Sequence, residues 1–388
     1  MRSTLGRLTV MAALLMVVVA VPAALGQVPT IKIGFFAPLT GPAAPDGTSS
    51  RNGAQMAVDE INAAGGVLGR PLGLVVYDDR LSASEAVAIA HRLIERDRVV
   101  AVVAGSYSGP TRATAPIFQS AGIPTVAAYA VHPDITKAGD YVFRNSFLGT
   151  IQGKAGAYLA ARILNAKTAS ILVMDIDFGR ALASGFRTQA AAYGLRIVSE
   201  DTYPLGEKEF APLLTKIKGL NPDVIYATAY FAEAAQIVRQ AKALGITSRI
   251  IGQEGYDSPK FLELAGPAAE GVIITTNLNR DDTRPVAQQF LGRYKARFGI
   301  DADMVGASSY DAVRIIAAAI EKAGVVSPPR IRDQIYRIAN FDGVTGIIRG
   351  YNKLGEVLKT VQVQIVREGR FRYFAVIDDP AVITPPTE

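Results

Sequence analysis

The sequence of 388 residues contains no cysteine and only two histidines. It therefore cannot form a disulfide bond, and no thiolate is available to hold a metal ion or a lipid anchor. A Ser-His-acid triad would have to use His91 or His132. We expect His91 to lie within an amphipathic helix and His132 to lie in a loop before Pro133. Neither setting favours catalysis.

Basic residues are not concentrated in any stretch of the chain. The formal net charge is +6, but Lys and Arg are spread singly among acidic residues, without a basic stripe that carries interleaved aromatics. This pattern does not support binding to nucleic acid. No His, Asp or Glu cluster has the spacing of metal ligands, so we predict neither a metal site nor a cofactor.

Only the N-terminus carries a long apolar run. Two arginines precede the run at residues 8–21, and the small-residue sequence Ala-Leu-Gly ends at Gly26. These features describe an export signal peptide, residues 1–26, with cleavage near Gly26. An uncleaved anchor is the alternative, but the run is shorter than the roughly 20 residues that a membrane span needs. We predict a soluble protein exported to the periplasm, without a lipid-bearing cysteine.

The remaining sequence alternates between strand and helix patterns as far as about Tyr310. "IKIGFF" and "PLGLVVYDD" predict strands, and "VVAVVAG" has the continuous apolar character of a parallel strand covered on both faces. Amphipathic helical segments separate these strands. The alternation predicts an α/β fold with parallel sheets, and the length suits two domains of roughly 150–180 residues each.

A weak internal repeat indicates that the two domains are similar. One helix begins at Ser108 and leads to Gly122, and another begins at Tyr230 and leads to Gly245. Each unit contains a strand, a polar break, the helix, Gly-Ile, a second strand and a second polar break. Open α/β sheets bind ligands at the carboxyl ends of their strands, where these breaks lie. Two facing lobes would form a binding cleft there.

The first polar break, in "VVAGSYSGPTRA", raises the question of a serine nucleophile. A nucleophile elbow, G-x-S-x-G, needs serine at its centre, but this position holds Tyr107. The free N–H groups at the start of the following helix, together with the Ser108 hydroxyl, could hold a carboxylate. The alternative is that Ser108 only caps the helix. We predict no catalytic residue, and therefore a protein that is not an enzyme.

The matching break in the second unit carries Glu254 at the end of a strand. This carboxylate would receive an ammonium group if it faces the cleft, and simple exposure to solvent is the alternative. Ser108 and Glu254 together suggest a zwitterion held between the lobes. Aromatic side chains at or just after such breaks would supply apolar walls, namely Tyr107, Tyr129, Phe178, Tyr230 and Phe231.

The order of these segments along the chain resembles that of the periplasmic solute-binding proteins of branched-chain amino acid ABC transporters, the Leu/Ile/Val-binding type. The similarity covers nearly the whole mature chain and includes "AGIPTVA", "YVFRN", "FAPLLTKIKGLNPDVIYATAY", "IIGQEG" and "FDGVTGIIRGYNKLGE". It implies the type I periplasmic binding fold, with two Rossmann-like lobes that close on a ligand.

The resemblance also implies the domain boundaries. Lobe 1 would contain residues 27–145 and 278–345, and lobe 2 residues 146–277 and 346–388. Three crossover strands would join the lobes. "YVFRN" and "IITTN" would be the first two, and the segment Gly343–Ile348 the third.

Eight ligand-binding residues follow from the resemblance and from the polar breaks. Ser108 matches the serine that holds the ligand carboxylate, and Tyr230 and Glu254 match the residues that meet the amino group. Val131 stands where leucine-binding members use a hydroxyl residue, and Asp46 stands where an aromatic is common. The full set is Asp46, Tyr107, Ser108, Tyr129, Val131, Phe178, Tyr230 and Glu254.

We therefore expect a monomeric binding protein that delivers a small amino acid, branched-chain or otherwise apolar, to a membrane permease. Binding of an aromatic acid, another small carboxylate or an amide by the same fold is one alternative. A ligand-sensing receptor subunit is another, and it would need a signalling module after "VITPPTE". The failed catalytic motifs disfavour an exported hydrolase.

Overall fold

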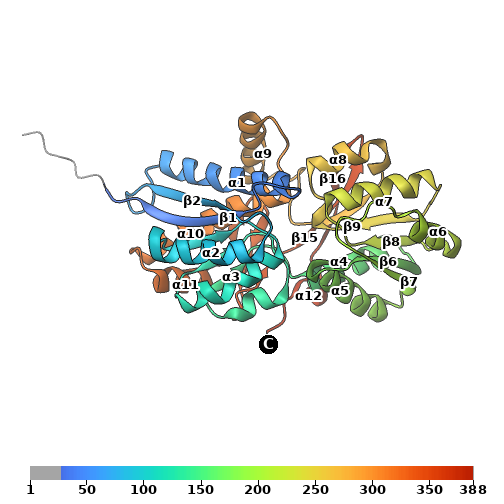
Figure 1. The fold of residues 1–388 in the computed structure, drawn as a ribbon, viewed down its shortest axis with the longest axis horizontal. Coiled ribbons are helices and arrows are strands. Elements are labelled where there is room, and N and C mark those ends of the chain that lie inside the picture. The colour runs from blue at the N-terminus through green and yellow to red at the C-terminus, as the bar shows by residue number, and fades with distance from the viewer. Residues whose placement is uncertain (1–27, 388) are drawn as a thin grey trace, which may run out of the picture.

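The computed structural model describes residues 28–387, so the predicted signal peptide lies outside the described residues. The chain forms two lobes side by side, each with a β-sheet between helices (Figure 1). We call the part built on the five-stranded sheet lobe 1 and the part built on the seven-stranded sheet lobe 2. Within residues 28–387, no helix is both long enough and apolar enough to span a membrane.

Lobe 1 contains a parallel sheet with the strand order β2-β1-β3-β4-β5. Its strands are β1 (Ile31–Ala37), β2 (Leu72–Asp78), β3 (Ala101–Ala104), β4 (Thr125–Ala127) and β5 (Val142–Arg144). Its helices are α1 (Ala44–Ala63), α2 (Ala83–Arg92), α3 (Ser108–Ser120), α9 (Pro285–Phe298), α10 (Met304–Ala323) and α11 (Pro328–Tyr336). Every residue of β3 is buried, as its continuous apolar run predicts.

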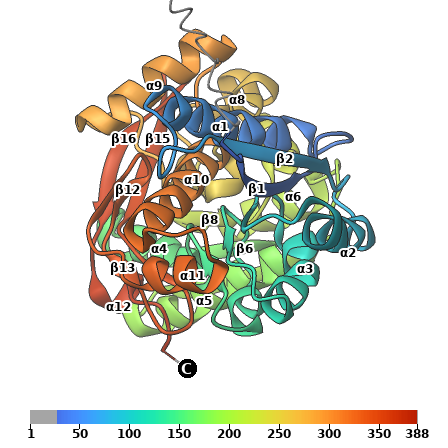
Figure 2. The same ribbon diagram turned by 90° about the vertical axis from the view of Figure 1, so that its left-hand side faces the viewer.

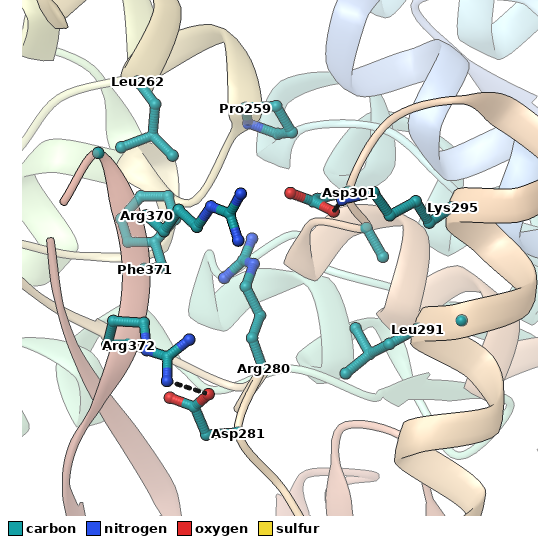
Figure 3. Close-up of a pocket in the computed structure, with 13 residues that line it drawn as sticks. Pro259, Leu262, Arg280, Asp281, Leu291, Lys295, Asp301, Arg370, Phe371 and Arg372 are labelled. Carbon is teal, nitrogen blue, oxygen red and sulfur yellow. Dashed lines mark ion pairs between the residues drawn. The ribbon is translucent and has the colours of Figure 1, made fainter. Parts of the chain in front are cut away.

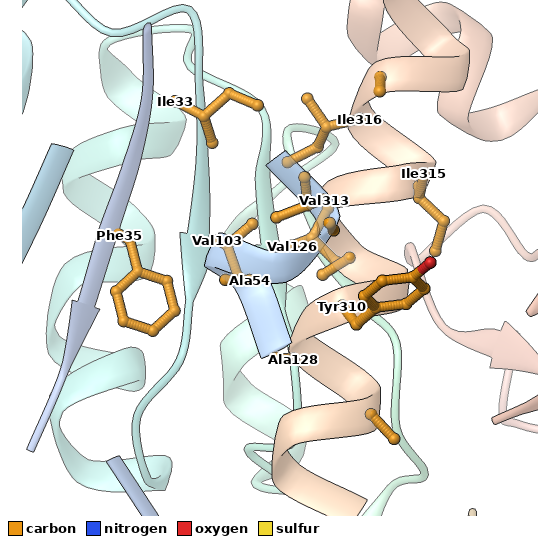
Figure 4. Close-up of a cluster of buried hydrophobic side chains, with 14 of the residues drawn as sticks. Ile33, Phe35, Ala54, Val103, Val126, Ala128, Tyr310, Val313, Ile315 and Ile316 are labelled. Atoms are coloured by element: carbon orange, nitrogen blue, oxygen red, sulfur yellow. The ribbon is translucent and has the colours of Figure 1, made fainter. Parts of the chain in front are cut away.

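Helices cover both faces of this sheet. Viewed from the end of lobe 1, α10 and α11 lie on one side of β1 and β2, and α2 and α3 lie on the other (Figure 2). On the α10 side, Val103 and Val126 of the sheet pack with Val313 and Ile316 of the helix (Figure 4). This packing fixes the carboxyl ends of the strands, from which the loops of the site emerge.

Lobe 2 contains a mixed sheet with the strand order β16-β15-β10-β9-β8-β6-β7, in which β15 is antiparallel to both of its neighbours. Its strands are β6 (Thr168–Met174), β7 (Arg196–Tyr203), β8 (Val224–Ala227), β9 (Arg249–Gly252), β10 (Ile273–Thr276), β15 (Val361–Arg367) and β16 (Arg370–Ile377). Its helices are α4 (Gly149–Tyr158), α5 (Asp177–Tyr193), α6 (Ala211–Leu220), α7 (Phe231–Ala243), α8 (Pro259–Ala265) and α12 (Pro380–Ile383). The predicted α/β architecture with two parallel-rich sheets is confirmed.

The internal repeat is visible in the two lobes. Helix α3 follows β3 and helix α7 follows β8, and each helix is 13 residues long. Gly122 and Gly245 come just after these helices with φ of +65° and +68°, a left-handed conformation that glycine adopts without steric cost. The two units therefore place Tyr107 and Tyr230 at equivalent cap positions, with Ser108 and Phe231 as the first residues of the two helices.

The third connection between the lobes lies later in the chain than the sequence analysis placed it. Two short hairpins, β11–β12 and β13–β14, cover residues 341–358, with the strands β11 (Phe341–Gly343), β12 (Gly346–Ile348), β13 (Gly350–Tyr351) and β14 (Val357–Leu358). Ile348 and Val357 pack in the hydrophobic cluster of lobe 1, whereas Val361 and Val363 pack in that of lobe 2. The chain thus crosses near residues 358–360. The prediction of a crossover at Gly343–Ile348 is wrong because this segment folds back on itself as a hairpin.

Candidate functional site

One cavity between the lobes brings together all eight residues that the sequence analysis proposed as ligand contacts. The space between its lining residues, including space open to solvent, is about 320 Å³. Lobe 1 and lobe 2 both contribute to its wall, and the predicted residues in that wall are Asp46, Tyr107, Ser108, Tyr129, Val131, Phe178, Tyr230 and Glu254. Their convergence agrees with a shared site, while their roles as ligand contacts stay predictions.

The cavity lies where helices begin. Its lining includes residues in the first turn, or at the cap, of helices from both lobes, namely Asp46 of α1, Ser108 of α3, Phe178 of α5, Tyr230 before α7 and Met304 of α10. The first N–H groups of a helix lack partners within the helix and carry a partial positive charge. The part of the cavity beside these helix starts is therefore suited to an anionic group such as a carboxylate.

Ser108 does not act as the cap of α3. Tyr107 occupies the cap position, and no side chain caps the helix. The Ser108 Oγ instead accepts a hydrogen bond from the Val131 N–H at 3.2 Å and so links two loops of lobe 1. Because the hydroxyl accepts this bond, its own hydrogen can be donated to a group inside the cavity.

The two histidines contact groups other than the serines of the polar break after β3. His91 is exposed on α2, 3.4 Å from Glu95. The His132 Nδ1 accepts a hydrogen bond from the Asp134 N–H at 3.2 Å. Among the hydrogen bonds of residues 28–387, none joins either histidine to Ser106 or Ser108. Within residues 28–387, neither histidine is therefore placed as a general base for these serines.

Aromatic rings from both lobes form one wall of the cavity. The ring of Tyr230 is stacked on that of Tyr107, with 4.5 Å between centroids, and on that of Phe178, with 4.8 Å. Tyr129 meets Tyr107 edge to face at 6.0 Å. The Tyr129 hydroxyl donates to the Gly105 carbonyl oxygen at 2.7 Å, which fixes the orientation of that ring. These rings would surround the apolar part of a ligand.

Two buried carboxyl groups face the cavity. Asp46 is 6% exposed and accepts a hydrogen bond from the Tyr107 hydroxyl at 2.6 Å; Glu254 is 5% exposed and accepts one from the Ser146 hydroxyl at 2.9 Å. Burial raises the pKa of Asp46 to about 6 and the pKa of Glu254 to about 8. In the described part of the chain, neither carboxyl group forms an ion pair. A positively charged group in the cavity would favour their ionised forms.

The backbone around Glu254 is held in place by its neighbours. The Gln253 side chain accepts a hydrogen bond from the Gly255 N–H at 2.7 Å and donates one to the Ala229 carbonyl oxygen at 3.0 Å. A Cβ atom on Gly255 would lie 2.2 Å from that same carbonyl oxygen, so no larger residue fits without a shift. Glu254 is therefore presented to the cavity by a fixed loop, and simple solvent exposure is excluded by its burial.

Four residues of the lining were not predicted from the sequence. They are Ala130, Gly255, Met304 and Val305. Met304 and Val305 begin α10, whose cap residue Asp303 accepts a hydrogen bond from the Gly306 N–H at 2.9 Å. An Asp before a helical pattern is a start signal that the sequence shows. It does not show that this helix starts at the cleft.

An ion pair also spans the lobes beside the cavity. Arg112 of α3 lies 2.7 Å from Asp177 of α5, and the His132 Nε2 lies 3.9 Å from the same carboxylate. Burial lowers the pKa of His132. Together with the stacking of Tyr107 on Tyr230, this contact holds the two lobes against each other.

Residues 28–387 contain no group of three His, Cys, Asp or Glu side chains that could hold a metal ion.

Comparison with known proteins extends the similarity over most of the chain. The family model described as periplasmic binding protein matches residues 30–369. A leucine-, isoleucine-, valine-, threonine-, and alanine-binding protein of Pseudomonas aeruginosa is 31% identical over 330 residues, which cover 84% of this chain and 87% of that protein.

Two solved structures share both the fold and about the same identity. A leucine-binding protein from Thermotoga maritima superposes with a TM-score of 0.84 at 31% identity, covering 91% of this chain and 100% of that one. A branched-chain amino acid transporter substrate-binding protein from Streptococcus pneumoniae, in complex with isoleucine, gives a TM-score of 0.83 at 31% identity. That match covers 90% of this chain and 99% of the other.

Proposed function

The chain belongs to the periplasmic binding protein family, and we propose that it carries a small amino acid, branched-chain or otherwise apolar, to the membrane permease of an ABC importer. Proteins of this family are transport components without enzymatic activity, which confirms the prediction that the chain is not an enzyme. The similar proteins named above bind branched-chain amino acids, and this supports the same ligand class here.

The observation that carries the proposal is that hydrogen-bond donors of lobe 1 and a carboxyl group of lobe 2 line the same cavity. The first turn of α3 and the Ser108 hydroxyl offer hydrogen-bond donors on lobe 1, and Glu254 offers a buried carboxyl group on lobe 2, which an ammonium group would ionise. A zwitterion would satisfy both sides at once, with its carboxylate at the helix start and its ammonium group at Glu254. The rings of Tyr107 and Tyr230 would lie against its side chain.

A carboxylate without an amine is the second candidate. It is favoured by Val131, whose side chain offers no hydroxyl to the groups on the ligand α-carbon. The parallel rings of Tyr107, Tyr230 and Phe178 would also suit a planar aromatic acid. In that case Glu254 would remain protonated or would repel the ligand.

Calorimetry of the purified protein separates the two candidates. Leucine, isoleucine, valine and phenylalanine would be titrated beside 4-methylpentanoate, 3-phenylpropanoate and benzoate. We expect binding of at least one amino acid and much weaker binding of its deaminated partner. Binding of the deaminated acids with equal or higher affinity would favour the second candidate. Binding of neither class would contradict both.

We further propose that the protein works as a monomer whose lobes close around the ligand. The contacts come from loops of both lobes, which only a hinge at the three connections can bring together. Solution scattering should show a smaller radius of gyration with a bound ligand than without one.

A further inference from the structure

A second groove lies between the lobes, lined by residues that do not belong to the cavity described above (Figure 3). The space between its walls, including space open to solvent, is about 1070 Å³, and the walls come from α8 and β16 of lobe 2 and from α9 of lobe 1. Four cationic side chains and two acidic ones line it, namely Arg280, Lys295, Arg370 and Arg372 with Asp281 and Asp301. The groove therefore carries an excess of positive charge.

Arg280 is the most constrained of these cations. Its side chain is 13% exposed, and its guanidinium group lies over the ring of Phe371, 4.8 Å from the centroid. Its Nη2 donates to the carboxylate of Asp257, whereas its Nη1 is buried without any hydrogen-bond partner among the described residues. A buried donor without a partner costs free energy, and the cost is larger for a charged group.

Arg370 adds to the excess of positive charge in the groove. Its guanidinium group points toward that of Arg280 in the middle of the groove (Figure 3). Arg372 lies 3.4 Å from Asp281 and Lys295 lies 2.8 Å from Asp301, but no ion pair of Arg370 occurs within residues 28–387. Two facing guanidinium groups repel each other, and an anion between them would remove the repulsion while giving the Nη1 of Arg280 an acceptor.

We propose that this groove binds an oxyanion of the phosphate class, held between Arg280 and Arg370. The planar fork of arginine matches phosphate oxygens two at a time, which a lysine does not. Pro259, Leu262, Leu291 and Phe371 line the same groove and would contact an apolar part of the ligand. The anion is either a free phosphate compound or the headgroup of an anionic phospholipid. This site is independent of the amino-acid site.

The test uses the whole protein and three matched substitutions. Inorganic phosphate would be titrated by calorimetry, and vesicles of phosphatidylglycerol would be compared with vesicles of phosphatidylcholine by co-sedimentation. Arg370→Gln and Arg280→Gln each remove one guanidinium group from the groove. Arg196→Gln is the control, because Arg196 is exposed at the start of β7, at the opposite edge of the same sheet.

We expect Arg370→Gln to weaken binding by about fivefold or more and Arg280→Gln by more than that, with Arg196→Gln within about twofold of the unchanged protein. Binding of free phosphate indicates a soluble ligand, and binding only to phosphatidylglycerol vesicles indicates a headgroup. Arg280→Gln leaves Asp257 without its ion-pair partner, so a lower melting temperature would show that this substitution disturbs the structure. In that case the comparison of Arg370→Gln with Arg196→Gln tests the proposal. The absence of binding to either probe, or equal effects of Arg370→Gln and Arg196→Gln, would overturn the proposal.

Discussion

The ring of Tyr107 in lobe 1 lies nearly parallel to the ring of Tyr230 in lobe 2, with 4.5 Å between their centroids. This contact joins the two lobes in the wall of the cavity. An aromatic pair of this kind contributes roughly 0.5–1.5 kcal/mol beyond the burial of its surface, which is small beside a typical ligand-binding free energy. The closed arrangement can therefore open for a ligand, and the residues behind the two rings decide what is bound.

Glu254→Gln tests the amine of the ligand. If an ammonium group pairs with this buried carboxylate, removing the charge should cost about 2–5 kcal/mol and lower the affinity for leucine more than tenfold. The deaminated acid should bind poorly to both proteins. Calorimetry with leucine and 4-methylpentanoate measures both effects, and unchanged leucine binding in Glu254→Gln would contradict the amino-acid proposal.

The pH dependence of binding follows from the same residue. Burial raises the pKa of Glu254 to about 8, so in the empty cavity it is mostly protonated at pH 7. An ammonium ligand favours the ionised form, so binding releases a proton and affinity should rise by up to about tenfold per unit as pH increases toward 8. Calorimetry between pH 6 and 8.5 measures this rise. Glu254→Gln should give a much flatter profile, and an equal slope in both proteins would assign the proton to another group.

The same shift in pKa affects stability with a definite sign. The ordinary pKa is 4.5, so an unfolded chain releases the proton of Glu254 near that pH while the folded protein keeps it to about 8. The folded state thus binds more protons between these values, and the free energy of unfolding should fall as pH rises through this window. Melting temperatures of the ligand-free protein should fall more steeply than those of Glu254→Gln, by a few degrees in total.

The sequence allowed the fold and most of the site to be predicted because both depend on local signals. The continuous apolar run of β3 and the polar break after it determined where Ser108 would emerge, and the repeat placed Tyr230 at the corresponding break in lobe 2. The parallel arrangement then places both breaks at the carboxyl ends of strands. The resemblance to a known family supplied the pairing of the two lobes.

The remaining features depend on contacts between distant segments. Nothing local in the sequence brings the start of α10, with Met304 and Val305, to the cleft. The hairpin at 341–348 has Gly343 and Gly346 on either side of its turn, a local signal that the prediction of a single crossover strand overlooked, and its position on lobe 1 depends on the packing of Ile348. Arg280 and Arg370 are 90 positions apart in the sequence, so only the folded chain brings them to the same groove.

Ser108→Ala tests the carboxylate side of the cavity. The hydroxyl accepts the Val131 N–H and can donate its hydrogen to a ligand, so its loss should weaken binding by roughly 1–2 kcal/mol. The melting temperature of the ligand-free protein should fall slightly, since the Val131 N–H loses its acceptor. Covalent labelling of Ser108 by a serine-directed phosphonate would show a nucleophile and contradict the assignment.

The ion pair between Arg112 and Asp177 should favour closure. The side chains are 44% and 27% exposed, so solvent and salt screen the pair, and we expect it to contribute only about 0.2–1 kcal/mol. Arg112→Gln should therefore lower ligand affinity by no more than about fivefold at low salt and less at high salt. A double-mutant cycle with Asp177→Asn measures the coupling. Zero coupling at low salt would show that the pair does not stabilise the closed form.

Val131→Thr distinguishes the two candidate ligands through a nearly isosteric change. Val131 is 1% exposed, and a hydroxyl placed there without a partner should destabilise the ligand-free protein by about 1–3 kcal/mol. An amino acid would supply the missing partner through its α-carbon groups, so leucine should bind about threefold to tenfold more tightly, the value of one added hydrogen bond. Stability and affinity should thus change in opposite directions.

Val131→Ala is the matched control for that substitution, because it also alters the contact surface but adds no hydroxyl. It should lower both the melting temperature and the affinity, since it leaves unfilled volume beside the ligand. If Val131→Thr instead weakens leucine binding as much as Val131→Ala does, the α-carbon groups do not lie at this wall. An unchanged affinity for 3-phenylpropanoate or benzoate in Val131→Thr would then favour a ligand without an amine, because such a ligand leaves the new hydroxyl unused.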